Sequence, residues 1–317
     1  MGFRLTAFAP GQAGAVDVAL SKLVEIVRRA HDELSALVSR DGTAAEIDVL
    51  AEWLYLHWYS RPMPNRICTP TLPGRANLVP ALRAALAATG RWETGWVALQ
   101  VLPDNSCMAG RGQLTRVVAS GDYANVARPG VPLAPGDGLA VLDRLEWVDE
   151  PTGFWGCRSL EAEPSHPLTR IYWSVGWECI GKVLCGLMPM LDATRRPWSL
   201  KCPSQAVEFA RVDSLVVYLA QADWPVFEPQ VRACAVSLAA YLHEAVPPLT
   251  LPITRGVALA DSPSLTQSFG QSRCAALAEG VRTLLTHRCI ESSEAIELLK
   301  QSLRNRAIDP AKPWVCD

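Results

Sequence analysis

Lysine is scarce in this sequence, and the short motifs that mark common nucleotide and metal sites are missing. No complete G-x-G-x-x-G motif and no G-x-x-x-x-G-K-[ST] motif occurs, which argues against a nucleotide-binding loop. The ten cysteines form no C-x-x-C pair, so no metal site is expected and the thiols are predicted to be reduced. Only five of the 30 basic residues are lysines: Lys22, Lys182, Lys201, Lys300 and Lys312.

The chain also lacks a strong net charge and a long apolar run. Its formal net charge is −2, so its overall electrostatics indicate neither nucleic acid nor a membrane as a partner. The longest apolar region, 175–191, contains Glu178 and Lys182, which excludes a membrane span there. No charged segment is followed by an apolar run of sufficient length, so no signal peptide is predicted. The protein is therefore expected in the cytoplasm.

The apolar residues that are present predict a large folded core. Hydrophobic residues make up 49% of the 317 positions and charged residues 20%, which is typical of a globular protein. Apolar residues at steps of three or four predict N-terminal helices, and alternation after residue 95 predicts strands. The helices are expected at 15–38, 43–58, 79–89, 177–191, 229–244, 269–286 and 292–304. The strands are expected at 96–101, 114–119, 140–145, 161–175, 198–202 and 212–220.

The order of these elements predicts an α+β fold, with N-terminal helices followed by a mixed, mainly antiparallel sheet with packed helices. A helical region is placed at 1–92 and an α+β region at 93–317, either as separate units or as one continuous domain. The segment 247–261, which contains proline and glycine, is expected to be a loop or an edge strand.

Three cations stand in apolar or small-residue surroundings. Arg170 opens the motif RIYW, Lys201 is the centre of LKC, and Arg273 is the sixth residue of SFGQSRC. Charged side chains are rarely buried unless they are paired. The pattern therefore indicates that the fold directs positive charge toward an anionic ligand.

Elimination of phosphate from phosphoserine or phosphothreonine is a chemistry that suits such cations. It needs a base near the Cα–H, cations around the departing phosphate and a proton donor for the leaving oxygen. A lysine becomes a base when burial or neighbouring positive charge lowers its pKa, whereas arginine keeps its proton and grips phosphate. Lys201 is therefore the candidate base. The candidate phosphate ligands are Arg170, Arg211, Arg255 and Arg273.

Each candidate also has an ordinary structural interpretation. An ion pair with Asp213, two positions along the same predicted strand face, would account for Arg211. Arg273 is better placed, near the start of a helix whose N–H groups would add to an anion site. His57 is the first candidate for the acid, because a histidine pKa can lie near neutrality, and His166 is the alternative. A histidine at an aromatic helix end is often structural.

Taken in order, these motifs resemble the HopA-type effector family, named from a type III secretion effector of plant pathogens. The resemblance covers roughly 53–61 and 170–281, and it includes RVD at 211–213 and GVALAD at 256–261. The family often has a lysine where this chain has Arg255, and a histidine or another polar residue where it has Ser272. Bacterial relatives resemble the lyase components of class V lanthipeptide and thioamitide Ser/Thr dehydratases.

The resemblance implies a phosphoserine or phosphothreonine lyase that needs neither a cofactor nor a metal. Its partners would be a phosphorylated precursor peptide and a separate kinase-like phosphotransferase subunit, in a heteromer. The product would be dehydroalanine or dehydrobutyrine in a ribosomally made peptide. The alternative is a non-catalytic, effector-like scaffold that binds a peptide leader or a partner protein. A scaffold has no need of Lys201 on a strand face opposite apolar neighbours, which favours the enzyme.

Overall fold

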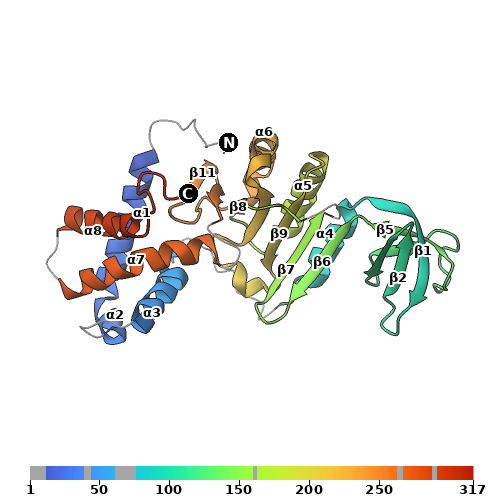
Figure 1. Ribbon diagram of the computed structural model, residues 1–317, viewed down its shortest axis with the longest axis horizontal. Helices are drawn as coiled ribbons and strands as arrows, with labels where there is room; N and C mark the ends of the chain where they lie inside the picture. Colours follow the sequence, from blue (N-terminus) through green and yellow to red (C-terminus); the bar gives the residue numbers. More distant parts are fainter. Residues whose placement is uncertain are drawn as a thin grey trace.

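The computed structural model describes residues 12–38, 44–60, 76–159, 163–262, 267–287 and 291–316. Helices α1 (Gln12–Arg29), α2 (His31–Leu37) and α3 (Ala44–Leu54) are followed by a π-helical turn, Tyr55–Tyr59. They pack against α7 (Phe269–Thr286) and α8 (Ser292–Asn305). The two ends of the chain thus build one end of the molecule together, at the left of Figure 1. Thr43, where the second helix was expected to begin, lies outside the described residues.

Five short strands form a small antiparallel sheet at the opposite end of the molecule (Figure 1). They are β1 (Trp92–Val101), β2 (Cys107–Arg111), β3 (Leu114–Val118), β4 (Tyr123–Asn125) and β5 (Gly138–Leu142), in the order β3-β2-β1-β5-β4. Alternate residues point to one face of such strands, and they give this sheet its own apolar cluster. The cluster contains Trp96, Ala98, Cys107, Ala109, Val118, Leu139 and Val141.

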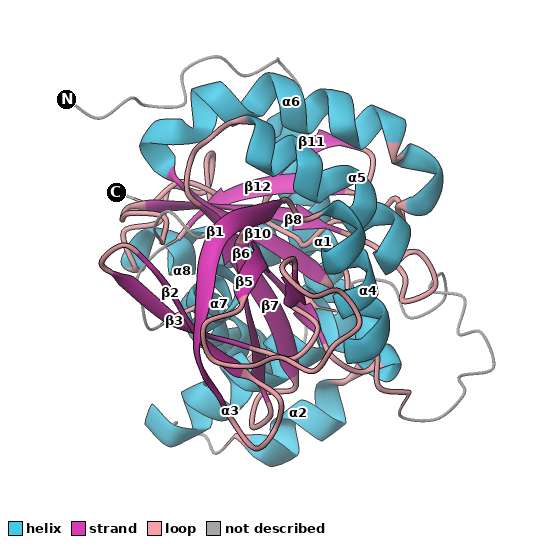
Figure 2. Ribbon diagram, turned by 90° about the vertical axis from the view of Figure 1, so that its right-hand side faces the viewer, coloured by secondary structure: helices cyan, strands magenta, loops and turns pink. Residues whose placement is uncertain are grey.

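A seven-stranded antiparallel sheet forms the centre of the molecule, in the order β11-β12-β8-β10-β9-β7-β6. Its strands are β6 (Arg144–Asp149), β7 (Phe154–Ser159), β8 (Leu168–Trp173), β9 (Trp198–Pro203), β10 (Leu215–Ala220), β11 (Leu251–Thr254) and β12 (Val257–Asp261). Helices α4 (Val79–Thr89), α5 (Ile180–Ala193) and α6 (Trp224–Ser237) gather on one side of the strands (Figure 2). Trp155, Leu200, Val217 and Ile171 belong to the same buried cluster as these helices.

The α+β fold is confirmed, with the strands divided between two antiparallel sheets. The strand predicted at 140–145 was wrong as a single element, because Asp143 separates β5 from β6. Its carboxylate accepts hydrogen bonds from the main chain and the side chain of Arg91, and the chain crosses there from one sheet to the other. The segment 247–261 contains the hairpin β11–β12. The division of the chain at residue 92 stays a prediction.

Helix α7 begins and ends at the residues that the sequence predicts. Ser268 caps it: the hydroxyl accepts a hydrogen bond from the Gln271 amide, and the Gln271 side chain accepts one from the Ser268 amide. This reciprocal arrangement satisfies two N–H groups at the helix start.

Candidate functional site

The cations of β8 and β9 lie on the face of the large sheet opposite Leu200 and Val217. In the strand register Tyr218 is opposite Arg170 on β8 and Ser199 on β9, while Val216 is opposite Tyr172 and Lys201. Residues paired across antiparallel strands share a face. Arg170, Tyr172, Tyr218 and Lys201 therefore lie on one face, and the fully buried Leu200 and Val217 lie on the other.

Lys201 and Arg170 stand over the same aromatic ring. The Lys201 Nζ atom lies 5.9 Å from the centre of the Tyr218 ring and 4.7 Å from that of Phe154. The Arg170 guanidinium carbon lies 5.3 Å from the Tyr218 centre. Such contacts hold a cation without neutralising it. Among the residues that the structure describes, no carboxylate forms an ion pair with either cation.

Neutral groups hold the buried guanidinium of Arg170. Its Nε and Nη2 atoms donate to the Ser262 hydroxyl at 3.1 and 3.0 Å, and Nη2 also approaches the Gln267 carbonyl at 3.4 Å. Burial acts to lower the pKa of Arg170, but the nearby Tyr172 and Tyr218 raise it overall. Arg170 therefore stays protonated and presents positive charge that no described carboxylate balances.

The π-helical turn and the start of α7 close one end of this face. The Tyr55 and Tyr59 rings are stacked, with centres 5.5 Å apart. Gly270 packs so closely on Tyr59 that a Cβ atom there would lie 2.3 Å from the ring, which explains the glycine in the SFGQSRC motif. Burial raises the pKa values of Tyr59 and Tyr172, so both hydroxyls remain protonated.

Arg211 has a carboxylate partner. Its Nε and Nη2 atoms donate to the two Asp213 oxygens at 2.9 and 2.8 Å, and Nη2 donates to the Tyr55 hydroxyl at 2.7 Å. The ion pair that the sequence offered as the alternative for Arg211 is therefore present. Arg255 lies exposed in the turn between β11 and β12, 3.7 Å from Glu244. A phosphate-binding role for these two arginines stays a prediction.

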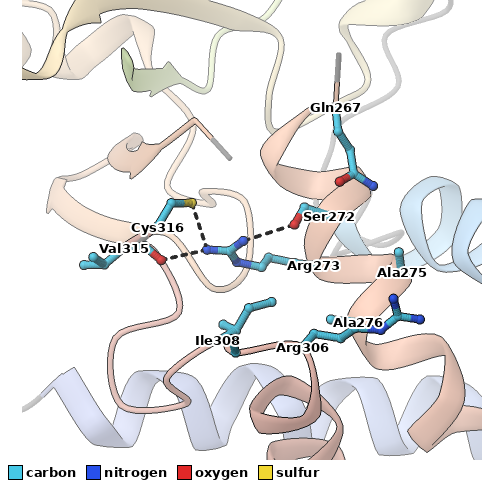
Figure 3. A pocket seen from close by; sticks show the side chains of 10 residues that line it. Gln267, Ser272, Arg273, Ala275, Ala276, Arg306, Ile308, Val315 and Cys316 are labelled. Carbon is cyan, nitrogen blue, oxygen red and sulfur yellow. Dashed lines mark hydrogen bonds between the residues drawn. The ribbon is translucent and has the colours of Figure 1, made fainter. Parts of the chain in front are cut away.

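Arg273 lies on α7 and binds the C-terminal segment, as Figure 3 shows. Its Nε donates to the Pro313 carbonyl at 2.7 Å, Nη2 to the Val315 carbonyl at 2.9 Å and the Cys316 sulfur at 3.4 Å, and Nη1 to the Ser272 hydroxyl at 3.2 Å. A guanidinium has only five N–H groups. Most of its binding capacity is thus already used within the chain.

A cavity of about 330 Å³ adjoins Arg273 and is also lined by Gln267 and Arg306. Arg170 approaches the Gln267 carbonyl from the sheet, so Gln267 connects the surroundings of the two arginines. Among the described residues, the aromatic rings beneath Lys201 (Phe154 and Tyr218) differ from the ring beneath Arg273 (Phe269) and from its hydrogen-bond partners in the C-terminal segment. The structure brings Arg170, rather than Arg273, to Lys201, and binding of one phosphate by both Lys201 and Arg273 stays a prediction.

The two candidate acids lie at exposed positions. His57 stacks on Trp53, with ring centres 4.7 Å apart, and His166 precedes Pro167 in a cis peptide bond. In the described part of the chain, neither contacts Lys201 or Arg170 through a hydrogen bond or a ring. The sequence did not single out Phe154 and Tyr218, because the run LVVYLA at 215–220 is apolar throughout and carries no alternation that would mark the face of Tyr218.

The described residues show no group of histidine, cysteine, aspartate and glutamate that could hold a metal ion. No helix in the described part of the chain is long and apolar enough to cross a membrane. The cysteines in the same ranges are free. Burial raises the pKa of Cys157, Cys202 and Cys274, which keeps these thiols protonated.

A family model matches a large part of this chain. The model of the HopA1 effector protein family matches residues 151–315, which include Arg170, Lys201, Tyr218 and Arg273 but not the small sheet. Curated protein sequences gave no match.

Two solved structures of effector proteins are similar to the chain. The effector protein from Pseudomonas syringae pv. tomato strain DC3000 is 17% identical, with a TM-score of 0.40 over 53% of this chain and 66% of that one. The effector protein from Pseudomonas syringae pv. syringae strain 61 is 15% identical, with a TM-score of 0.38 over 51% of this chain and 62% of that one. The chain spans less than two thirds of each effector.

Proposed function

The chain belongs to the HopA1 effector protein family, and we propose that it is a lyase that eliminates phosphate from phosphoserine or phosphothreonine in a peptide. The observation that supports this proposal is the placement of Lys201 and Arg170 over one ring, Tyr218. One cation that can lose its proton and one that cannot are the two charges that this elimination requires.

In the proposed reaction Arg170 binds the phosphate and Lys201, in its neutral form, takes the proton from Cα. The Cα–H electron pair forms the Cα=Cβ double bond, and the Cβ–O bond breaks with its electron pair on the phosphate oxygen. The positive charge of Arg170 stabilises the departing phosphate. The peptide is left with dehydroalanine from serine or dehydrobutyrine from threonine.

The departing phosphate also needs a proton. Because Lys201 and Arg170 lie within 6 Å of the centre of one ring, the ammonium that forms on Lys201 lies close to a phosphate held by Arg170. Lys201 returns the proton to the phosphate oxygen, which leaves as hydrogen phosphate, and the neutral amine is restored. His57 and His166 remain the alternatives for this step.

The proposed substrate is a ribosomally made precursor peptide that a kinase-like partner has phosphorylated. Hydroxide is a poor leaving group, so the lyase acts only after phosphorylation. The reaction is proposed to need no cofactor and no metal, because Arg170, and Lys201 once it has taken the Cα proton, supply the charge stabilisation. The protein is proposed to work in the cytoplasm, in a heteromer with that kinase-like subunit.

The test is mass spectrometry of a phosphothreonine peptide incubated with the protein and a chelator. The expected product is lighter than the unphosphorylated threonine peptide by one water, because elimination leaves dehydrobutyrine. Recovery of threonine itself would identify a phosphatase and contradict the proposal. Binding of the phosphopeptide with no change in mass would favour the scaffold. The unphosphorylated peptide, incubated with ATP, is the control and is expected to remain unchanged.

A further inference from the structure

The two sheets present edge strands to a common groove. Strand β3 pairs with β2 alone and β6 pairs with β7 alone within the described sheets. Residues of both strands line one cavity of about 280 Å³, to which Arg83 and Asp122 also contribute. The groove lies outside the region matched by the family model, so it is distinct from the Lys201 site.

The free side of β6 has main-chain groups available for pairing. In the described part of the chain, the main-chain N–H and C=O groups of residues 145–148 form main-chain hydrogen bonds with β7 only. Likewise, the described main-chain hydrogen bonds of residues 115–118 of β3 are with β2 only. An unpaired strand edge is a template for an added strand, and peptide-binding domains use such edges to hold extended ligands.

Three apolar side chains beside the groove are exposed. Val117 on β3 is 59% exposed, and Trp147 and Val148 on β6 are 37% and 39% exposed. A strand added to β6 would cover alternate side chains of this edge. The apolar contacts would then accompany the main-chain hydrogen bonds that set the peptide direction.

Arg116 brings a positive charge to a groove whose lining also contains Asp122 and Glu146. Its Nη2 donates to the Leu142 carbonyl at 3.0 Å, and its buried Nε and Nη1 atoms have no acceptor among the described atoms. No described carboxylate forms an ion pair with it. Burial lowers the pKa of Arg116, while Asp122 acts against this effect. A carboxylate from a ligand would satisfy a guanidinium that the chain leaves underused.

We propose that the groove between β3 and β6 binds an extended polypeptide segment, which adds as a strand to the free edge of β6 and places an acidic side chain against Arg116. The main-chain edge selects an extended backbone, and the guanidinium selects the acidic residue. The occupant is thus a peptide ligand, separate from the phosphorylated residue that Arg170 receives.

The groove is connected to the Lys201 face by one row of residues. Trp147 is opposite Gly156, and Gly156 is opposite Lys201. A Cβ atom on Gly156 would lie 2.2 Å from the Trp147 ring, so the indole covers this glycine. Strands are spaced about 4.8 Å apart, so Trp147 stands about 10 Å from Lys201 across the sheet. Insofar as the groove positions a substrate, this inference rests on the proposed function.

The probe is an unphosphorylated peptide of about ten residues with alternating valine and threonine, one central glutamate and a lysine at each end. Its binding is measured by isothermal titration calorimetry and requires no elimination. Two versions carry N-methyl groups on alternate amides, one on each set. Only one set faces β6 in an added strand, so one methylated peptide should lose binding at least tenfold and the other should bind as the parent does. Equal affinities for both, or no binding of the parent, would overturn the proposal.

Arg116→Gln should weaken binding of the glutamate peptide about tenfold and leave a glutamine version unaffected. Arg111→Gln is the matched control, because Arg111 also lies over the Trp96 ring but is paired with Glu93. Equal losses in the two variants would contradict the role of Arg116. If sedimentation shows a dimer that Trp147→Ala disrupts and the peptides do not bind, the groove is an interface between two copies and the peptide proposal fails. Elimination assays on the same variants show separately whether the Lys201 site works.

Discussion

Arg170 and Lys201 reach the ring of Tyr218 from two strands that are not neighbours in the sheet. The guanidinium carbon of Arg170 lies 5.3 Å from the ring centre and the Lys201 amine 5.9 Å. Strand β10 lies between β8 and β9, so its tyrosine is within reach of both cations. Both side chains can therefore interact with one anion, and no described carboxylate neutralises either of them.

Arg170→Gln should weaken phosphopeptide binding by about ten- to a hundredfold, because a charge-assisted contact to phosphate is lost. Arg211→Gln is the matched comparison, since Asp213 already holds that guanidinium. It should lower the melting temperature, because the Asp213 carboxylate loses its partner, while phosphopeptide affinity changes less than threefold. Binding isotherms and thermal unfolding measure both variants. A larger loss of affinity in Arg211→Gln than in Arg170→Gln would transfer the phosphate-binding role to Arg211.

Arg273→Gln should destabilise the fold by about 2–4 kcal/mol, because the C-terminal carbonyls lose a buried charged donor. The segment 307–316 should then become sensitive to limited proteolysis before the rest of the chain does. Denaturant unfolding and mass spectrometry of the cleavage products measure the two effects. If the variant keeps its stability but loses phosphopeptide affinity, Arg273 is a phosphate ligand, as the sequence motif suggested.

Asp137 should make the small sheet sensitive to acid. The hydrogen bond from Arg128 and the Ala134 amide hold the pKa of Asp137 below its usual range. A lowered pKa in the folded state adds stability above the unfolded-state pKa, about 4, and this stability is lost as pH falls through the folded-state pKa. Asp137→Asn should therefore lower the melting temperature at pH 7 and have little effect near pH 2. An equal difference at both pH values would contradict this linkage.

Gly156→Ala should destabilise the protein by about 1–3 kcal/mol, because the new Cβ would lie 2.2 Å from the Trp147 ring and 2.9 Å from the Leu200 carbonyl oxygen. Gly181→Ala is the control, because no atom lies within 4 Å of a Cβ built there. Gly181 is the second residue of α5, so that change should alter the stability by less than about 1 kcal/mol. Urea denaturation followed by tryptophan fluorescence measures both. A destabilisation of Gly181→Ala equal to that of Gly156→Ala would show that the Trp147 contact is not the cause.

The sequence predicts elements whose signals are local and misses contacts that depend on strand order. Helix α7 was predicted correctly because an apolar helical period marks it. Alternation along 198–202 placed Lys201 opposite Leu200 for the same reason. The shared Tyr218 ring could not be predicted, because the pairing of β10 with both β8 and β9 is a property of the whole sheet.

Long-range contacts also decide what each cation does. The C-terminal carbonyls that bind Arg273 lie 40 and 42 residues away along the chain, and no local pattern announces them. Strands β2, β4 and β7 were missed because they are short or contain glycine. Phe154, which holds the Lys201 amine, lies on one of these missed strands.

The most direct test of the proposed chemistry is the elimination rate of Lys201→Arg on a phosphothreonine peptide, measured by mass spectrometry beside a binding isotherm. Arginine keeps the positive charge over Tyr218 and Phe154 but does not lose its proton to become a base. The account predicts that elimination falls at least a thousandfold, in line with the loss of general-base catalysis, while phosphopeptide affinity stays within about threefold. Near-normal elimination by Lys201→Arg would show that Lys201 is not the base and would contradict the mechanism.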